Sequence, residues 1–213
     1  MTSTFDAKAA QWDEHPERLA MTQRAAEAIG GVVRPESSMR ALEFGCGTGT
    51  LSFLLRDRLG QIVLCDASSG MLEVARKKID DAAATASMSL LLSDLETGPL
   101  PEGKFDLIYT AMALHHVIDT DALLQRFAGL LNPAGRLALI DLVQEDGSFH
   151  QKTEPVPHNG FAMEELERQV KNAGLRVDSC RVLDAIERDN GRSYPRFILL
   201  AHLPELEPQE EPS

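Results

Sequence analysis

The feature that most constrains this 213-residue chain is a glycine-rich turn between a strand pattern and a helix pattern. The apolar run 40–44 leads into Gly-Cys-Gly-Thr-Gly at positions 45–49, and leucines at helical spacing follow from Thr50. Glycine adopts positive φ angles at little steric cost and lets a ligand approach the main chain. A strand that leads into such a turn and then into a helix N-terminus is typical of a nucleotide-type site at the carboxyl end of the strand.

Strand and helix patterns alternate along most of the remaining chain. The expected strands are 40–44, 61–65, 88–92, 105–109, 136–142, 177–185 and 196–202, and the expected helices are 50–59, 69–84, 119–131 and 162–173. Strands separated by helices of this length form a parallel sheet with helices on both faces. The short connection 187–195 predicts that the last strand runs antiparallel to its predecessor. We therefore expect an α/β fold with a doubly wound, Rossmann-like, seven-stranded, mostly parallel sheet.

The chain is expected to form one domain over residues 1–203, with an N-terminal helical cap at 1–34 and the Rossmann-like core at 35–203. The acidic, proline-rich tail 204–213 is expected to be disordered. Trp12, the only tryptophan, suits either a core position of the cap or a lid over the ligand, and the sequence leaves both open.

Local signals predict details of packing and capping. Helical spacing places four leucines of segment 50–59, Leu54 among them, on its buried side. Ser69 has the chemistry of an N-cap for the helix that follows it. The turn after the helix 119–131 predicts a left-handed Gly135, and the run 88–92 predicts a buried strand.

Composition and charge narrow the classes of partner. Lys and Arg number 21 and Asp and Glu number 33, so the formal net charge is −12. An acidic surface repels phosphate backbones, and nucleic acid is not an expected partner. Cys46, Cys65 and Cys180 are odd in number and lack a C-x-x-C pair, which argues against disulfides and structural zinc. Without a leader pattern or a long apolar run, we expect a cytoplasmic protein that does not bind membranes.

Two cofactors compete for the glycine turn. A dinucleotide site requires G-x-G-x-x-G and an acid about 20 residues further on. Here the third glycine, Gly49, comes one residue early and Thr50 occupies the last position of that motif. Asp66, at the end of the second expected strand, suits a ribose contact in either case.

Five segments at strand ends point to a specific family. They are EFGCGTG at 43–49, CDASSGM at 65–71, SDL at 93–95, FDLI leading to LHH at 105–116, and LNPAGR at 131–136. In order and spacing they resemble the motifs of class I S-adenosylmethionine-dependent methyltransferases, of the small-molecule, ubiquinone-biosynthesis-like type. The resemblance covers about residues 5–202 and implies S-adenosylmethionine as the cofactor.

The resemblance also implies roles for the matching residues. Glu43 would reach the amino group of the methionine moiety, and Asp66 would accept both ribose hydroxyls with its two oxygens. The other implied cofactor contacts are the main chain of Gly45, Cys46 and Gly47 on the methionine moiety, Ala67 and Met71 around adenine, Asp94 and the Leu95 amide on its polar edge, and Thr110 and Ala111 near the sulfonium. Simpler interpretations stay open, since Asp94 can cap a turn and Glu43 can be a strand-end charge.

Methyl transfer is an in-line displacement, so the protein aligns the nucleophile, excludes water and, for weakly acidic nucleophiles, removes a proton. Histidine titrates near neutrality, which suits such a base. The candidates are His115, His116, His150 and His158. The resemblance favours His116, and the motif His-Asn-Gly-Phe at 158–161 favours His158, so these two are the predicted catalytic residues. His115 is adjacent to His116, and at most one of the two is expected to face the pocket.

Missing patterns narrow the reaction. The residues 109–112 are Tyr-Thr-Ala-Met rather than N/D-P-P-Y, which argues against methylation of exocyclic base or amide nitrogens. Asp141 alone cannot supply the oxygen ligands of a catechol-type magnesium site. We therefore predict metal-independent methyl transfer to a small molecule held between the cofactor, the cap and the loop 143–160, with the acceptor atom and the oligomeric state left open. The alternatives are an NAD-dependent oxidoreductase and a non-catalytic, S-adenosylmethionine-binding regulatory protein.

Overall fold

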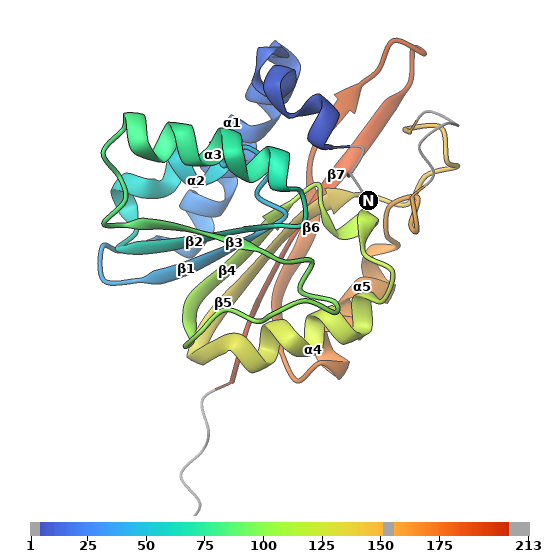
Figure 1. The fold of residues 1–213 in the computed structure, drawn as a ribbon. Coiled ribbons are helices and arrows are strands. Elements are labelled where there is room, and N and C mark those ends of the chain that lie inside the picture. The colour runs from blue at the N-terminus through green and yellow to red at the C-terminus, as the bar shows by residue number, and fades with distance from the viewer. Residues whose placement is uncertain (1–4, 151–155, 205–213) are drawn as a thin grey trace, which may run out of the picture.

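The computed structural model describes residues 5–150 and 156–204 (Figure 1). Its strands are β1 (Arg40–Phe44), β2 (Gln61–Asp66), β3 (Met88–Leu92), β4 (Phe105–Ala111), β5 (Leu131–Leu142), β6 (Arg176–Glu187) and β7 (Ser193–His202). Its helices are η1 (Asp6–Glu14), α1 (Pro16–Val33), α2 (Thr50–Leu55), η2 (Arg56–Arg58), α3 (Ser69–Asp81), η3 (Leu114–His116), α4 (Thr120–Leu130) and α5 (Met163–Asn172), where η marks a 3₁₀ helix.

The seven strands form one sheet in the order β3-β2-β1-β4-β5-β7-β6. The first five strands pair in parallel, whereas β7 runs antiparallel to both of its neighbours, β5 and β6. This arrangement confirms the expected α/β fold with an antiparallel last strand. The strand order reverses between β1 and β4, and ligands of such sheets bind at the carboxyl ends of the strands beside this point.

Helices cover both faces of the sheet, and the two faces bury separate cores. Figure 1 shows α1, α2 and α3 over one face and α4 and α5 over the other. Successive residues of a strand point to opposite faces, so Ala41 joins the core under α1–α3 while Leu42 joins the core under α4 and α5. The same alternation in the other strands gives the sheet two apolar faces, which explains the near-continuous hydrophobic runs in the sequence.

The structure corrects the expected positions of two apolar segments. Leu54 is 43% exposed, because Leu51 and Leu55, four residues apart, form the buried side of α2 and Leu54 lies to one side of it. Strand β3 is not a buried strand, since only Met88 is buried and Leu92 is 54% exposed. The reason is its position at the edge of the sheet, where one side has no neighbouring strand.

Two capping predictions also shift by one residue. The N-cap of α3 is Ser68 rather than Ser69, with its extended backbone and its Oγ accepting a hydrogen bond from the Met71 amide at 3.2 Å. After α4, the left-handed conformation falls on Ala134, at φ 59°, rather than on Gly135. Position 135 requires glycine for a steric reason instead, because a Cβ atom there would lie 2.7 Å from the Asn132 carbonyl oxygen.

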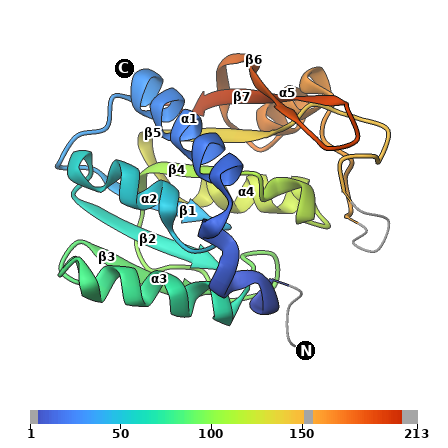
Figure 2. The same cartoon turned by 90° about the horizontal axis from the view of Figure 1, so that it is seen from above.

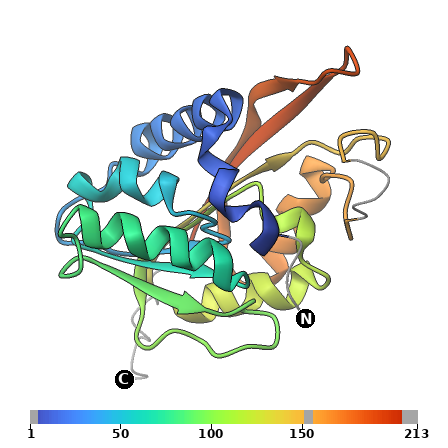
Figure 3. The same cartoon turned by 45° about the horizontal axis from the view of Figure 1, so that its top comes forward.

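The N-terminal cap consists of η1 and α1, as expected. In Figures 2 and 3 the dark blue η1 crosses from α1 towards the start of α3, over the end of the sheet. Asp6 fastens it there, because its Oδ1 accepts hydrogen bonds from the Ser68 hydroxyl at 2.5 Å and from the Gly70 amide at 2.8 Å. The predicted disordered tail lies almost wholly outside the described residues. Among those that are described, no helix has the length and apolar character needed to cross a membrane.

Candidate functional site

The glycine turn after β1 supports the local prediction of a ligand cradle. Gly45 and Gly47 have φ angles of 65° and 53°, which side chains rarely adopt. A Cβ atom on Gly45 would lie 2.3 Å from the Ala113 Cβ, so the turn packs directly against the segment after β4. A Cβ atom on Gly47 would lie 3.8 Å from the Trp12 Nε1 and 3.9 Å from the Met71 Sδ. The main chain of Gly47 therefore borders an open space between these two side chains.

That space is part of a cavity of about 380 Å³ at the carboxyl ends of the central strands. Ten of the predicted site residues line it, namely Glu43, Gly45, Cys46, Gly47, Asp66, Ala67, Met71, Asp94, Ala111 and His116. Leu95, Thr110 and His158 are not among the described residues that line it. The topology thus brings residues from four strand ends into one space, although the role of each stays a prediction.

Asp66 has spare capacity for a ribose. Its Oδ2 accepts a hydrogen bond from the Gly47 amide at 2.7 Å, and its Oδ1 accepts one from the Ser68 amide at 2.8 Å. An ionised carboxylate has about four acceptor sites, so each oxygen can accept one further donor. Burial raises the pKa of Asp66, against the lowering effect of these amides. Two hydroxyl donors would therefore stabilise its charged form.

Glu43 is the most deeply buried acid of the cavity, at 3% exposure. The Ser52 hydroxyl donates to its Oε2, and the Tyr109 hydroxyl lies 2.6 Å from the Ser52 oxygen. Burial raises the pKa of Glu43 to about 8, although the hydrogen bonds from Ser52 oppose the shift. A buried carboxyl of this kind is poised to ionise when a cation binds beside it.

Hydrogen bonds within their own loop already engage Asp94 and Leu95. Asp94 Oδ1 accepts hydrogen bonds from the amides of Glu96, Thr97 and Gly98 at 2.8–3.0 Å. These backbone donors lower the pKa of Asp94 to about 2. The turn-capping interpretation of Asp94 is thus what the structure shows, and its Oδ2 still has room for a further donor. The Leu95 amide donates to the Ser93 hydroxyl at 3.0 Å, so an adenine nitrogen would compete with that contact.

The remaining predicted residues lie beside the cavity rather than in its wall. Thr110 is fully buried, and its hydroxyl has no hydrogen-bond partner among the described residues. His158 packs its ring on Phe161, with 5.2 Å between the ring centroids. Its amide donates to the His115 carbonyl oxygen at 3.2 Å, so His158 supports the segment that carries His115. The His158 Nε2 is buried and has no hydrogen-bond partner among the described residues, but His158 does not line the cavity, so its catalytic role stays a prediction.

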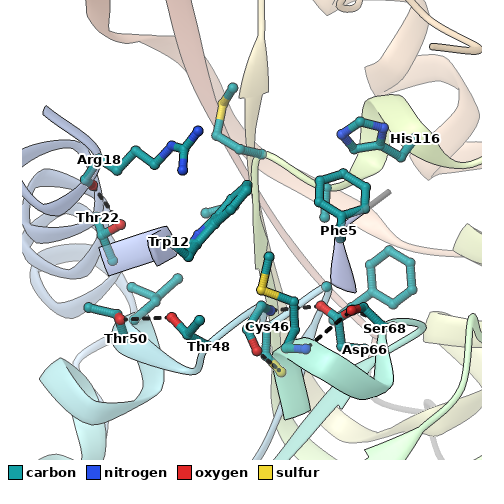
Figure 4. Close-up of a pocket in the computed structure, with 18 of the residues that line it drawn as sticks. Phe5, Trp12, Arg18, Thr22, Cys46, Thr48, Thr50, Asp66, Ser68 and His116 are labelled. Atoms are coloured by element: carbon teal, nitrogen blue, oxygen red, sulfur yellow. Dashed lines mark hydrogen bonds between the residues drawn. The ribbon is translucent and has the colours of Figure 1, made fainter. Parts of the chain in front are cut away.

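Trp12 and Phe5 border the cavity, so Trp12 is not a plug in the protein core. Figure 4 shows both rings from the N-terminal cap, across from Cys46 and Asp66, with His116 beyond Phe5. The ring centroids of Phe5 lie 5.9 Å from Trp12 and 5.1 Å from His116. Of the two interpretations left open by the sequence, the lid over a ligand agrees with this position.

His115 and Asp141 form a buried pair close to these rings, with 4.2 Å between the ring centroids of His115 and His116. The His115 Nδ1 lies 2.6 Å from the Asp141 Oδ1, and both side chains are at most 2% exposed. Both His115 and His116 line the cavity, contrary to the expectation that at most one would face it. The pairing was not predicted from the sequence, where Asp141 was a candidate metal ligand only, because a separation of 26 residues from His115 carries no local signal of pairing.

His150 and Phe149 complete this end of the cavity from the loop after β5. The His150 ring lies 4.9 Å from those of both His115 and Phe149. Burial lowers the pKa of His150 to about 4, and the neighbouring His115 adds to the effect. His150 is therefore neutral at neutral pH. The loop 143–160 was expected to border the pocket, and its described part does so.

Arg196 on β7 was not foreseen from the sequence. Its side chain is fully buried and lines the cavity, and its Nε and Nη2 donate to Asp184 at 2.8 and 2.6 Å. Arg24 donates to the same carboxylate at 2.5 Å, so two cations share one anion. No sequence motif marks Arg196, since only the β6–β7 hairpin brings it to this wall.

The chain is similar to known methyltransferases. A family described as "Methyltransferase domain" matches residues 41–135. Over 114 residues the chain is 35% identical to a ubiquinone/menaquinone biosynthesis C-methyltransferase of Shewanella frigidimarina. This match covers 52% of this chain and 45% of that protein. Residues 41–135, which include the glycine turn and Asp66, are thus similar to a methyltransferase domain. The chain spans about half the length of the curated relatives it matches, 45% and 54% in two of them.

Solved structures of methyltransferases share the fold of this chain. A methyltransferase solved in complex with the Haloferax volcanii Trm112 methyltransferase activator has a TM-score of 0.77 at 20% identity, covering 96% of this chain and all of that one. An S-adenosylmethionine-dependent methyltransferase of Aquifex aeolicus has a TM-score of 0.67 at 22% identity, covering 93% of this chain and 98% of that one. At such identities the likeness concerns the fold alone.

The cavity fits S-adenosylmethionine, the cofactor of class I methyltransferases. The Gly47 main chain lines the cavity beside Trp12 and Met71, and its positive φ of 53° favours a residue without a side chain there. Asp66 keeps free acceptor sites, and the buried Glu43 can take the charge of an amino group. Gly47, Asp66 and Glu43 would contact different parts of the cofactor, and all three line the same cavity.

Proposed function

We propose that this protein transfers a methyl group from S-adenosylmethionine to a small-molecule acceptor, without a metal ion. One observation carries the proposal. The glycine turn and Asp66 share a single cavity with aromatic and imidazole rings that come from the cap and from the loop after β5. A cofactor end and an acceptor end therefore border the same space.

The dimensions and lining of the cavity support a small acceptor. Its volume of about 380 Å³ lies within the range typical of small-molecule sites, roughly 300–1,000 Å³. When bound, the cofactor supplies a methyl group on positively charged sulfur, which is already activated for displacement. The protein then has to align the acceptor and exclude water, and Phe5 and Trp12 are placed to do both.

Metal independence rests on the donor chemistry of the site. Among the residues that the structure describes, no group of three or more His, Cys, Asp or Glu side chains could hold a metal ion. The clustered histidines pack ring against ring, and the His115 Nδ1 is already engaged by Asp141. We therefore propose that a side chain, rather than a metal, handles any proton of the acceptor.

We also propose a cytoplasmic protein that uses neither nucleic acid nor a membrane as its partner. The net charge of −12 disfavours association with phosphate backbones and with anionic lipid surfaces. Cys46 and Cys65 are buried, and all three cysteines are free thiols, which suits a reducing compartment.

Two measurements test this function. Calorimetric titration should show binding of S-adenosylhomocysteine and none of NADH. Transfer of a labelled methyl group to a panel of small molecules should then proceed equally with and without EDTA. Binding of NADH alone would favour the oxidoreductase alternative. Binding of the cofactor without transfer to any acceptor would favour a regulatory protein, and loss of transfer in EDTA would overturn metal independence.

A further inference from the structure

We propose that His115, positioned by Asp141, accepts the proton of the methyl acceptor, and that this proton comes from a hydroxyl group on an aromatic ring. The inference deepens the proposed function and rests on it. It replaces His116 and His158, the two histidines that the sequence favoured.

The pairing with Asp141 decides which nitrogen of His115 can act. Asp141 Oδ1 lies 2.6 Å from His115 Nδ1, and it also accepts from the Leu142 amide at 2.7 Å. Asp141 Oδ2 accepts from the His115 amide at 3.2 Å. A carboxylate only accepts hydrogen bonds, so the imidazole donates from Nδ1. The lone pair of the neutral ring is therefore on Nε2, and a base needs this lone pair.

The Nε2 atom is buried, yet it has no hydrogen-bond partner among the described residues. Burying an unpaired polar atom costs free energy, and such atoms in a native structure call for an explanation. His115 is 1% exposed and lines the cavity, so a ligand in that cavity is the partner that fits. The same reasoning applies to the Nε2 of the neighbouring His150, which is also buried and unpaired.

The rings around His115 indicate the shape of the acceptor. The His115 ring lies 4.2 Å from that of His116, which contacts Phe5, and 4.9 Å from that of His150, which contacts Phe149. Flat rings pack on one another in offset or edge-to-face arrangements at such distances. An aromatic acceptor therefore matches this wall, with its polar group directed to the two unpaired nitrogens.

The need for a base indicates which polar group that is. A neutral amine is already nucleophilic, and a thiol ionises at a pKa of about 8.5. A phenolic hydroxyl, with a pKa of about 10, is largely protonated at neutral pH and is close enough to histidine to exchange a proton. His150, whose pKa is about 4, stays neutral and does not repel an imidazolium at His115.

The proposed step is balanced without any further reactant. The O–H bond of the acceptor breaks, and its proton moves to His115 Nε2, which becomes an imidazolium facing Asp141. The oxygen lone pair forms the new bond to the methyl carbon. The carbon–sulfur bond breaks with its electron pair on sulfur, which leaves neutral S-adenosylhomocysteine. The proton on His115 is then lost to solvent when the products leave.

The first arm of the test needs no methyl acceptor. Nitrogen chemical shifts of ¹⁵N-labelled histidine distinguish the two neutral tautomers, and we expect His115 to carry its hydrogen on Nδ1. Asp141→Asn, which keeps the shape but offers a donor as well as an acceptor, should shift the balance towards the Nε2–H tautomer. If wild-type His115 carries its hydrogen on Nε2, the inference is overturned, whatever the enzyme does.

The second arm measures turnover with phenol, catechol, aniline and thiophenol as probes. His115→Gln should lower kcat on the two hydroxyl probes by about 10²- to 10⁴-fold. It should change the dissociation constant of S-adenosylhomocysteine less than about threefold, because the cofactor contacts lie elsewhere. Asp141→Asn should lower kcat by part of this factor and alter the pH profile, which a purely structural role would not do.

A matched control exists in a second carboxylate–histidine pair. His202 lies at the end of β7, and its Nδ1 is 2.9 Å from Asp178. This pair is at the opposite end of the strands from the cavity, beside Arg136 near the start of β5. His202→Gln should leave kcat within about twofold of the wild type. If S-adenosylhomocysteine does not bind the wild type, the proposed function itself fails. If it binds, but His115→Gln transfers methyl groups to phenol at the wild-type rate and pH profile, only the present inference fails.

Discussion

Binding of S-adenosylhomocysteine should release a proton from Glu43 near neutral pH. Burial raises the pKa of this carboxyl to about 8, so in the free protein it is protonated at pH 7 by roughly ten to one. A cationic amino group beside it favours the ionised form. Binding and proton release are then coupled, and ionising Glu43 at pH 7 subtracts about 1.4 kcal/mol from the binding free energy.

Calorimetry can measure this coupling directly. The affinity for S-adenosylhomocysteine should rise about tenfold between pH 6 and pH 7, and less steeply as the pH approaches 8. Titrations at pH 7 in buffers of different ionisation enthalpy should report about 0.9 protons released for each ligand bound. Glu43→Gln keeps the size of the side chain and an acceptor for the Ser52 hydroxyl, but it cannot ionise. The variant should therefore release no proton from this position and lose the steep pH dependence.

The same shift makes a prediction for the protein without ligand. The folded pKa of Glu43, about 8, exceeds the ordinary value of 4.5. Its contribution to stability is thus fully present below about pH 4.5 and is lost as the pH rises through about 8. Glu43→Gln should gain stability relative to the wild type over this range, by at most on the order of 5 kcal/mol. Proton release near zero at pH 7, or equal release by the variant, would refute the contact between Glu43 and the amino group.

Three further substitutions or measurements address the cofactor end of the cavity. Asp66→Ala should weaken S-adenosylhomocysteine binding by at least about 100-fold in calorimetry, because two hydroxyls lose a charged acceptor; an unchanged dissociation constant would remove the ribose contact. Trp12 is the only tryptophan and lines the cavity, so its fluorescence should change on cofactor binding, and a flat titration curve would place the ligand elsewhere. Gly45→Ala should lower Tm by roughly 4–8 °C, since it forces a side chain into a left-handed backbone beside Ala113; an unchanged melting curve would contradict that packing.

Much of the fold could be predicted from the sequence, because it is encoded over short distances. The apolar run 40–44 and the glycines that follow it each depend on neighbouring residues. Six of the seven strands begin and end within three residues of the prediction, whereas β5 begins at Leu131, five residues earlier than expected. The spacing of such elements then implies the parallel sheet, since a helix between two strands leaves few other connections. For the same reason the carboxyl ends of the strands, and with them Asp66 and Glu43, could be placed at one site.

Contacts between distant parts of the chain could not be predicted in this way. The pairing of His115 with Asp141 depends on the crossover through α4, and the approach of Arg196 depends on the register of the β6–β7 hairpin. The position of Trp12 depends on how Asp6 fastens η1 to α3. The sequence by itself determined the elements, their order and the cofactor end of the cavity, because those follow from local geometry. Only the tertiary structure decided which histidine of the cavity gains a carboxylate partner, because burial and charge pairing exist only once the chain has folded.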